Sequence, residues 1–294
     1  MNTLHTSAIL VSLHISKYDP FVFDRFVSEQ VAAEHAATKN AGKYRKSLFP
    51  DNCFPALTAI LKKLNELYVW HAENTLVWDG RGTRLLPIAL AEEHKTRTDS
   101  VLAELPAMLD ALETGYSAAC ETAQTKLNGM FKARDYPKSG FELRKRFAVT
   151  ADYNAVPQEV TGLPASVATL INSGIAERVN TSLDAAMSDA WTRLYTCVEK
   201  LHDKLATPGA IFRDTLVGNV REVCDVLTKL NITGNADLET MRAKVAADIA
   251  QYDPDTLRDN ALLREGVAKT AAGMLDTMRA TRKIVRLDDM EASA

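Results

Sequence analysis

Residues 79–84 read Asp-Gly-Arg-Gly-Thr-Arg, and a mixture of glycine and arginine of this kind can bind phosphate. A P-loop requires a lysine followed by serine or threonine at a fixed distance from its first glycine, and a helix after the loop. That lysine is missing here, and so is the third glycine of a dinucleotide-binding fingerprint. The apolar runs 76–78 and 83–86 instead predict a β-hairpin whose turn uses the glycines. A basic hairpin tip that contacts phosphate or an acidic partner is the alternative.

The other residue types that commonly carry chemistry do not fall into a catalytic or metal-binding spacing. None of the six histidines lies in an HExxH motif or at zinc-ligand distance from a cysteine, and the four cysteines form no CxxC pair. No GxSxG motif marks a nucleophilic serine. The sequence therefore predicts a protein that is not an enzyme and has no cofactor or metal. An active site assembled from distant residues is the alternative.

Basic residues are concentrated at 126–146, where seven lysines and arginines accompany only two acidic residues, for a net charge of +5. Phe131, Tyr136 and Phe141 are interspersed among them, and a smaller basic cluster lies at 39–46. We expect parts of these segments and of the hairpin to form one interaction surface. Its candidate residues are Arg81, Arg84, Lys132, Arg134, Tyr136, Arg144, Lys145 and Arg146.

Such a surface has two plausible classes of partner. Cations pair with phosphates and aromatic rings stack on bases, so it could bind nucleic acid. It could also meet an acidic protein surface. Residues 1–150 carry a net charge of +2, from 19 basic and 17 acidic residues, whereas 151–294 carry −5, from 16 and 21. This complementarity favours self-association or a protein partner, and nucleic acid stays the alternative.

The elements that must position these residues follow from hydrophobic periodicity. Alternation of apolar and polar residues predicts half-buried strands at 8–16 and 147–153, in addition to the hairpin. Apolar residues at helical spacing predict helices elsewhere; Pro20 opens the first of them and Pro106 divides another. The predicted helices cover 20–38, 52–73, 88–130, 165–206, 210–230, 236–251 and 255–282.

Strands and helices do not alternate as βαβ units, which argues against a parallel doubly wound sheet. We predict an α+β fold that is predominantly α-helical, in which a small antiparallel sheet packs on a helical bundle with long coiled-coil-like helices. Residues 1–160 form the mixed part with the sheet and 161–294 the helical part, within one continuous structural unit. In the helix at 165–206, Asp189 and Arg193 are spaced to pair across one turn.

Five segments carry a family resemblance: SAILVSLHISKYDP at 7–20, TLVWDGRGTRLLP at 75–87, KLNGMFKARDYP at 126–137, RKRF at 144–147 and AMSDAWTRLYTCVEKLHDKL at 186–205. They resemble an uncharacterised family of phage and prophage proteins, a domain of unknown function, over most of residues 1–206. The resemblance supplies no catalytic residues. It implies a mostly helical, phage-derived cytoplasmic protein. Genes of this family often lie beside one for a MoxR- or CobS-like AAA+ ATPase, which suggests that ATPase as a partner.

The N-terminal segment lacks the basic region of a signal peptide, and no stretch has the about 18 apolar residues of a membrane helix. We therefore expect no membrane association and a location in the cytoplasm of the bacterial host. Together these features predict a non-enzymatic phage accessory protein that forms a homo-oligomer or docks on a protein partner, with the AAA+ ATPase as a candidate. The alternative is a nucleic-acid-binding protein that acts in phage DNA replication or recombination.

Overall fold

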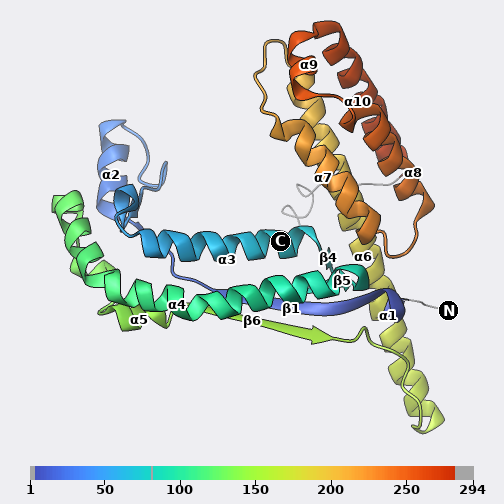
Figure 1. Ribbon diagram of the computed structural model, residues 1–294, viewed down its shortest axis with the longest axis horizontal. Helices are drawn as coiled ribbons and strands as arrows, with labels where there is room; N and C mark the ends of the chain where they lie inside the picture. The colour runs from blue at the N-terminus through green and yellow to red at the C-terminus, as the bar shows by residue number, and fades with distance from the viewer. Residues whose placement is uncertain (1–3, 81, 282–294) are drawn as a thin grey trace. The chain divides into compact units, whose positions relative to one another are not determined.

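The computed structural model describes residues 4–80 and 82–281, and Figure 1 shows their helices and strands. The chain divides into two compact units. Unit 1 consists of Met1–Ser12, His71–Glu93 and Asp152–Ala294, and unit 2 of Leu13–Trp70 and His94–Ala151. Each unit has its own apolar core, and we describe the two separately.

The sheet contains the strands predicted from alternation. The strand β1 is Ala8–Ser16, and its unit 1 part, Ala8–Ser12, pairs antiparallel with β5 (Thr83–Pro87), which in turn pairs antiparallel with β4 (Leu76–Val77). The full strand order is β4-β5-β1-β6, where β6 is Ala148–Asn154. Since long helices make up most of the remaining described chain, the predicted α+β class with a small antiparallel sheet is confirmed.

The first half of β1 is more deeply buried than its alternating pattern predicts. Leu10 belongs to the main core of unit 1, whereas the next residue, Val11, is buried with Leu86 and Leu90 in a small cluster of its own. Successive side chains of a strand point to opposite faces, so both faces are covered here. The predicted half-buried strand is therefore correct only further along β1.

The helices of unit 1 pack mainly around α6 (Ala165–Ala206), whose bounds match the prediction. Both α7 (Thr215–Leu230) and α10 (Ala261–Thr281) contact it. The remaining helices are α1 (Leu4–Ser7), α8 (Ala236–Val245), the π-helical turn η4 (Ala246–Ala250) and α9 (Pro254–Asp259). The single helix predicted at 255–282 is in fact two, because the chain is extended at Asn260 between α9 and α10.

Unit 2 is built around α3 (Pro55–Glu73) and α4 (Ile88–Leu127), most of whose residues belong to it. Apolar residues at helical spacing on both helices, among them Ile60, Leu64, Leu109 and Leu112, form its core. A two-stranded ribbon of β2 (Phe21–Phe23) and β3 (Arg45–Ser47) flanks α2 (Arg25–Glu34) in sequence. Shorter helices are α5 (Gly140–Arg144), η1 (Pro50–Asn52), η2 (Asn128–Met130) and η3 (Ala133–Asp135).

Two predictions based on proline are wrong. The chain after Pro20 forms β2, and α2 begins later because the Asp24 carboxylate caps it by accepting the N–H groups of Phe26 and Val27. Pro106 does not divide α4, which is one helix. A proline inside a helix costs about 3 kcal/mol. Leu105 and Leu109, on either side of Pro106, are buried in the core of unit 2, and burying such side chains stabilises the helix across the proline.

Candidate functional site

The glycine- and arginine-rich stretch closes a hairpin, as predicted. Trp78 and Asp79 donate their backbone N–H groups to the carbonyl of Thr83 at 3.3 and 3.4 Å, and the Asp79 carboxylate accepts the Thr83 N–H at 3.1 Å. Gly82 has a φ of +94°, which glycine adopts more readily than other residues. The predicted site residue Arg81 lies outside the described residues.

Arg84 binds the C-terminal end of α3. Its Nε donates to the Thr75 hydroxyl at 2.5 Å, and its Nη2 donates to the carbonyls of Thr75 and Ala72 at 3.0 and 3.2 Å. Carbonyls at a helix C-terminus lack partners within the helix and carry partial negative charge, so a guanidinium stabilises them. In unit 1, Arg84 therefore fastens the hairpin to the end of α3.

Arg193 on α6 binds the same helix end. It donates to the carbonyls of Glu73, Ala72 and Thr75 at 2.5, 2.9 and 2.7 Å. The predicted pair with Asp189 is confirmed at 2.9 Å, and the same carboxylate accepts the Val77 N–H at 3.3 Å. Two guanidiniums, one carboxylate and the end of α3 thus form one polar cluster, whose bonds join α3, β4 and α6.

A groove of about 590 Å³ lies beside this cluster in unit 1. Residues of α6 and α7 form much of its lining, which is largely apolar: Cys197, Leu216, Val223, Val226, Leu227 and Leu230. Burial raises the pKa of the Cys197 thiol to about 12. The thiol is therefore protonated near neutral pH, a state in which it is a poor nucleophile. The groove offers apolar contact surface more than reactive groups.

In unit 2, Lys132 and Arg134 lie close to carboxylates. The Lys132 Nζ is 3.4 Å from Asp24, and the Arg134 Nε is 3.9 Å from Asp135. Burial opposes ionisation of Asp24, but the hydrogen bond from the Val27 N–H and the charge of Lys132 outweigh it, and the pKa of the Asp24 carboxyl is lowered. Both cations line a hollow of about 310 Å³.

Lys46 is a buried charge that the sequence did not reveal. Its side chain is only 1% exposed, and its Nζ donates to Asp135 and to the carbonyl of Met130, both at 2.7 Å. Because Lys46 lies among the other basic residues of segment 39–46, nothing in the sequence predicts that it is buried. A lysine is rarely buried without a charged partner, and here Asp135 supplies the partner from 89 residues away in sequence.

Tyr136 lies in the core of unit 2. Its ring packs 5.5 Å from that of Phe49 and 4.9 Å from that of Phe131, and its hydroxyl donates to the Leu48 carbonyl at 2.7 Å. Burial raises the pKa of this hydroxyl. Tyr136 is 9% exposed, so its contacts are with other core residues.

The three basic residues at 144–146 differ in their surroundings. Arg144 forms ion pairs with Asp110 and Glu113 on α4. Lys145 lies 2.8 Å from Glu142 and over the ring of Phe141. Arg146 is exposed. Two of these three predicted cations are thus neutralised by carboxylates of the same unit.

Exposed aromatic side chains gather around β2 and the start of α2. Phe21 and Phe23 are 46% and 49% exposed and Phe26 is 72% exposed, all three within the range 20–38 for which a helix was predicted. Phe23 and Phe26 line the same hollow as Lys132. The Arg45 guanidinium lies 5.6 Å from the Phe21 ring centroid, and Asp19 neutralises it at 2.5 Å. We call Phe21, Phe23 and Phe26 the aromatic patch.

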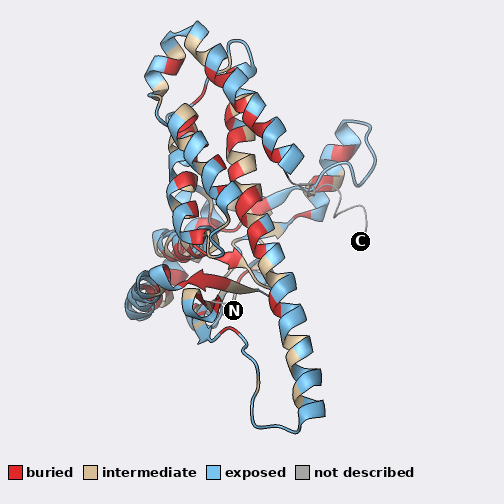
Figure 2. Cartoon of the chain, turned by 90° about the vertical axis from the view of Figure 1, so that its right-hand side faces the viewer, coloured by how far each residue is buried: buried red, intermediate tan, exposed pale blue. Residues whose placement is uncertain are grey.

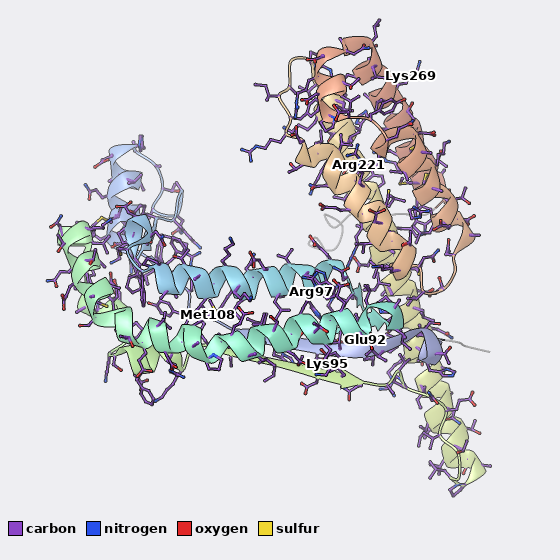
Figure 3. The ribbon with its side chains drawn as sticks, viewed as in Figure 1. Glu92, Lys95, Arg97, Met108, Arg221 and Lys269 are labelled. Carbon is purple, nitrogen blue, oxygen red and sulfur yellow. The ribbon has the colours of Figure 1, made fainter. Side chains whose placement is uncertain are left out.

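A histidine in the helical part of unit 2 is structural. His94 is fully buried and packs 5.8 Å from the ring of Trp70, and Arg97, labelled in Figure 3, lies over the same indole at 4.7 Å. Burial lowers the pKa of His94, which favours the neutral imidazole. Within residues 4–80 and 82–281, no group of three or more His, Cys, Asp and Glu side chains is arranged to hold a metal ion.

The predicted site residues belong to different units. Arg84 is in unit 1, and the six from Lys132 to Arg146 are in unit 2, so one joint basic surface stays a prediction. The chain matches no known protein-family profile, no curated protein and no solved structure. In the part of the chain that the structure describes, every helix is too short or too polar to cross a bilayer.

Proposed function

We propose that the chain is a non-enzymatic interaction protein that self-assembles or docks on a protein partner. The observation that carries this proposal is the exposure of bulky apolar side chains on ordered elements of both units. Phe26 is 72% exposed on α2 of unit 2, and Leu170 is 74% exposed on α6 of unit 1. Large exposed apolar patches are typical of sites that contact other proteins.

The charges of the predicted basic surface favour a protein partner over nucleic acid. Affinity for nucleic acid comes largely from cations that replace the counterions of phosphates. Arg84, Lys132, Arg144 and Lys145 each have a carboxylate of their own unit within 4 Å, which a phosphate would have to displace. An interface with a protein tolerates neutralised pairs at its rim, around an apolar centre.

The state of the buried thiols supports a non-enzymatic role. Burial raises the pKa of Cys197 to about 12 and that of Cys224 to about 11, so neither is activated as a nucleophile. Arg84, from the stretch considered as a phosphate site, and Arg193 hold the end of α3 instead. Both side-chain types thus contribute to packing in unit 1.

Two experiments test this proposal. Light scattering of the full chain measures self-assembly, and a pull-down with a MoxR- or CobS-like AAA+ ATPase measures docking on the partner that the phage-family resemblance suggests. We expect an oligomer, a complex with the ATPase, or both. A monomer at micromolar concentration that also fails to capture the ATPase would contradict the proposal.

The aromatic patch supports a second candidate, binding of single-stranded nucleic acid. Bases stack on exposed rings, and the exposed Lys39 and Lys43 lie just before β3 in sequence. In this case binding weakens with salt and with replacement of Phe21 and Phe23 by serine. A gel-shift series at low salt that detects no complex rules this candidate out.

A further inference from the structure

The first turns of α6 and the segment before them carry no charge. Residues 160–176 contain no Asp, Glu, Lys or Arg. Because 25% of the chain is charged, a segment of this length would have about four such residues on average. Exposed helices usually carry charged residues on their solvent side. This charge-free segment is therefore unlike an ordinary solvated helix.

An apolar stripe runs along this segment and faces solvent. Leu163, Val167, Leu170 and Ile171 recur at helical spacing and are 42%, 43%, 74% and 36% exposed. Further along the same face, Ile175 and Val179 pack into the core of unit 1. In Figure 2 the exposed part of α6 is the end of the long helix toward the bottom of the picture, in pale blue and tan. Only the later part of the stripe is covered by this chain.

The exposed part of the stripe is held in a defined conformation. The Asn172 side chain accepts the Val160 N–H at 2.8 Å and donates to the Val160 carbonyl at 3.2 Å, which ties the preceding segment to the helix. The hydroxyls of Thr169 and Ser173 donate to carbonyls of the same helix. These polar side chains already have hydrogen-bond partners within the segment, so a partner that covers the stripe need not supply any to them.

Gly174 adds a notch beside the stripe. Apart from the adjacent backbone of α6 itself, a methyl group built on Gly174 would have no atom within 4 Å, so the space above its backbone is open in the monomer. Leu170, one turn earlier, is the most exposed side chain of the stripe. A protruding leucine and an open glycine one turn apart are complementary when two such helices pack side by side.

We propose that residues 163–174 form a two-fold interface with a second copy of this chain, in which Leu170 of each copy fills the space above Gly174 of the other. This inference rests on the proposed function of self-assembly and names its surface. A two-fold axis places the same patch of both copies in contact, so a charged residue near its centre would meet its own like charge. A charge-free segment avoids that repulsion. A different protein recognised through its charge would gain no ion pair from such a segment.

The test compares the self-association of four full-length proteins by sedimentation equilibrium. Leu170→Ser removes the protruding side chain, and Gly174→Leu fills the notch. The matched control is Leu262→Ser, since Leu262 is 83% exposed on α10 of the same unit. We expect Leu170→Ser and Gly174→Leu each to weaken association by about tenfold or more, and the control to behave as wild type.

The design separates this inference from the proposed function. The Cβ that Gly174→Leu adds meets no other part of the chain within 4 Å, and leucine has the higher helix propensity, so we expect this variant to fold like wild type. If all four proteins associate equally, the interface lies elsewhere and only the inference fails. If wild type is monomeric but captures the ATPase, the inference also fails while the function stands. A wild-type monomer without any partner overturns both.

Discussion

Replacement of Lys46 by methionine tests the buried ion pair of unit 2. Methionine keeps the apolar stem but leaves Asp135, whose side chain is 13% exposed, without its main counter-charge. Removing one partner of a buried pair costs about 3–5 kcal/mol. Arg134 approaches Asp135 only to 3.9 Å and is itself 83% exposed, so it compensates little. We therefore expect Lys46→Met to lower the free energy of unfolding of unit 2 by about 3–5 kcal/mol.

The assay must resolve unit 2 from unit 1. Hydrogen exchange followed by mass spectrometry on peptides of residues 13–70 and 94–151 reports the opening free energy of that unit. Lys145→Met is the matched control, because the exposed Lys145–Glu142 pair is worth less than about 1 kcal/mol. The double variant Lys46→Met, Asp135→Asn should recover part of the loss. A cost below about 1 kcal/mol for Lys46→Met, without recovery in the double variant, refutes the reasoning.

Three further predictions concern single side chains. Arg193→Met removes the charged donor from three carbonyls and should destabilise unit 1 by about 2–3 kcal/mol in urea unfolding; an unchanged midpoint contradicts its role at the end of α3. Asp24→Ala should destabilise unit 2 by about 1 kcal/mol at neutral pH. Because the pKa of Asp24 is lowered in the folded state, this difference should begin to shrink as the pH falls below about 4 and be lost only once the pH passes the lowered folded-state pKa, and a difference that does not shrink at low pH contradicts the assignment. Cys197 should resist alkylation at pH 8 in the folded protein and react after unfolding, as measured by mass spectrometry of the intact and digested chain; rapid labelling of the native state means that the thiol is not held protonated.

Periodicity along the chain was enough to predict much of the fold. The regular apolar repeat of residues 165–206 predicted α6, because nearly every turn after Val179 has a buried residue. The hairpin followed from two apolar runs around glycines, as in β4 and β5. Both features depend on residues close together in sequence.

Features that depend on distant contacts could not be read from the sequence. The bonds that Arg193 makes to the end of α3 join it to Thr75, which lies 118 positions away in sequence. The burial of Lys46 likewise depends on Asp135. The exposure of Phe23 and Phe26 reverses the usual tendency of phenylalanine to be buried, and no local pattern signals it. The sequence could therefore propose a basic surface but could not predict which of its cations are already paired.

The most direct test of the central claim is native mass measurement of the full chain, with and without a single-stranded oligonucleotide, at physiological salt. We predict species of two or more copies without the oligonucleotide, and no added mass when it is present. A monomer that gains the mass of the oligonucleotide would contradict the account, because the chain would then bind nucleic acid rather than assemble through its exposed apolar surfaces.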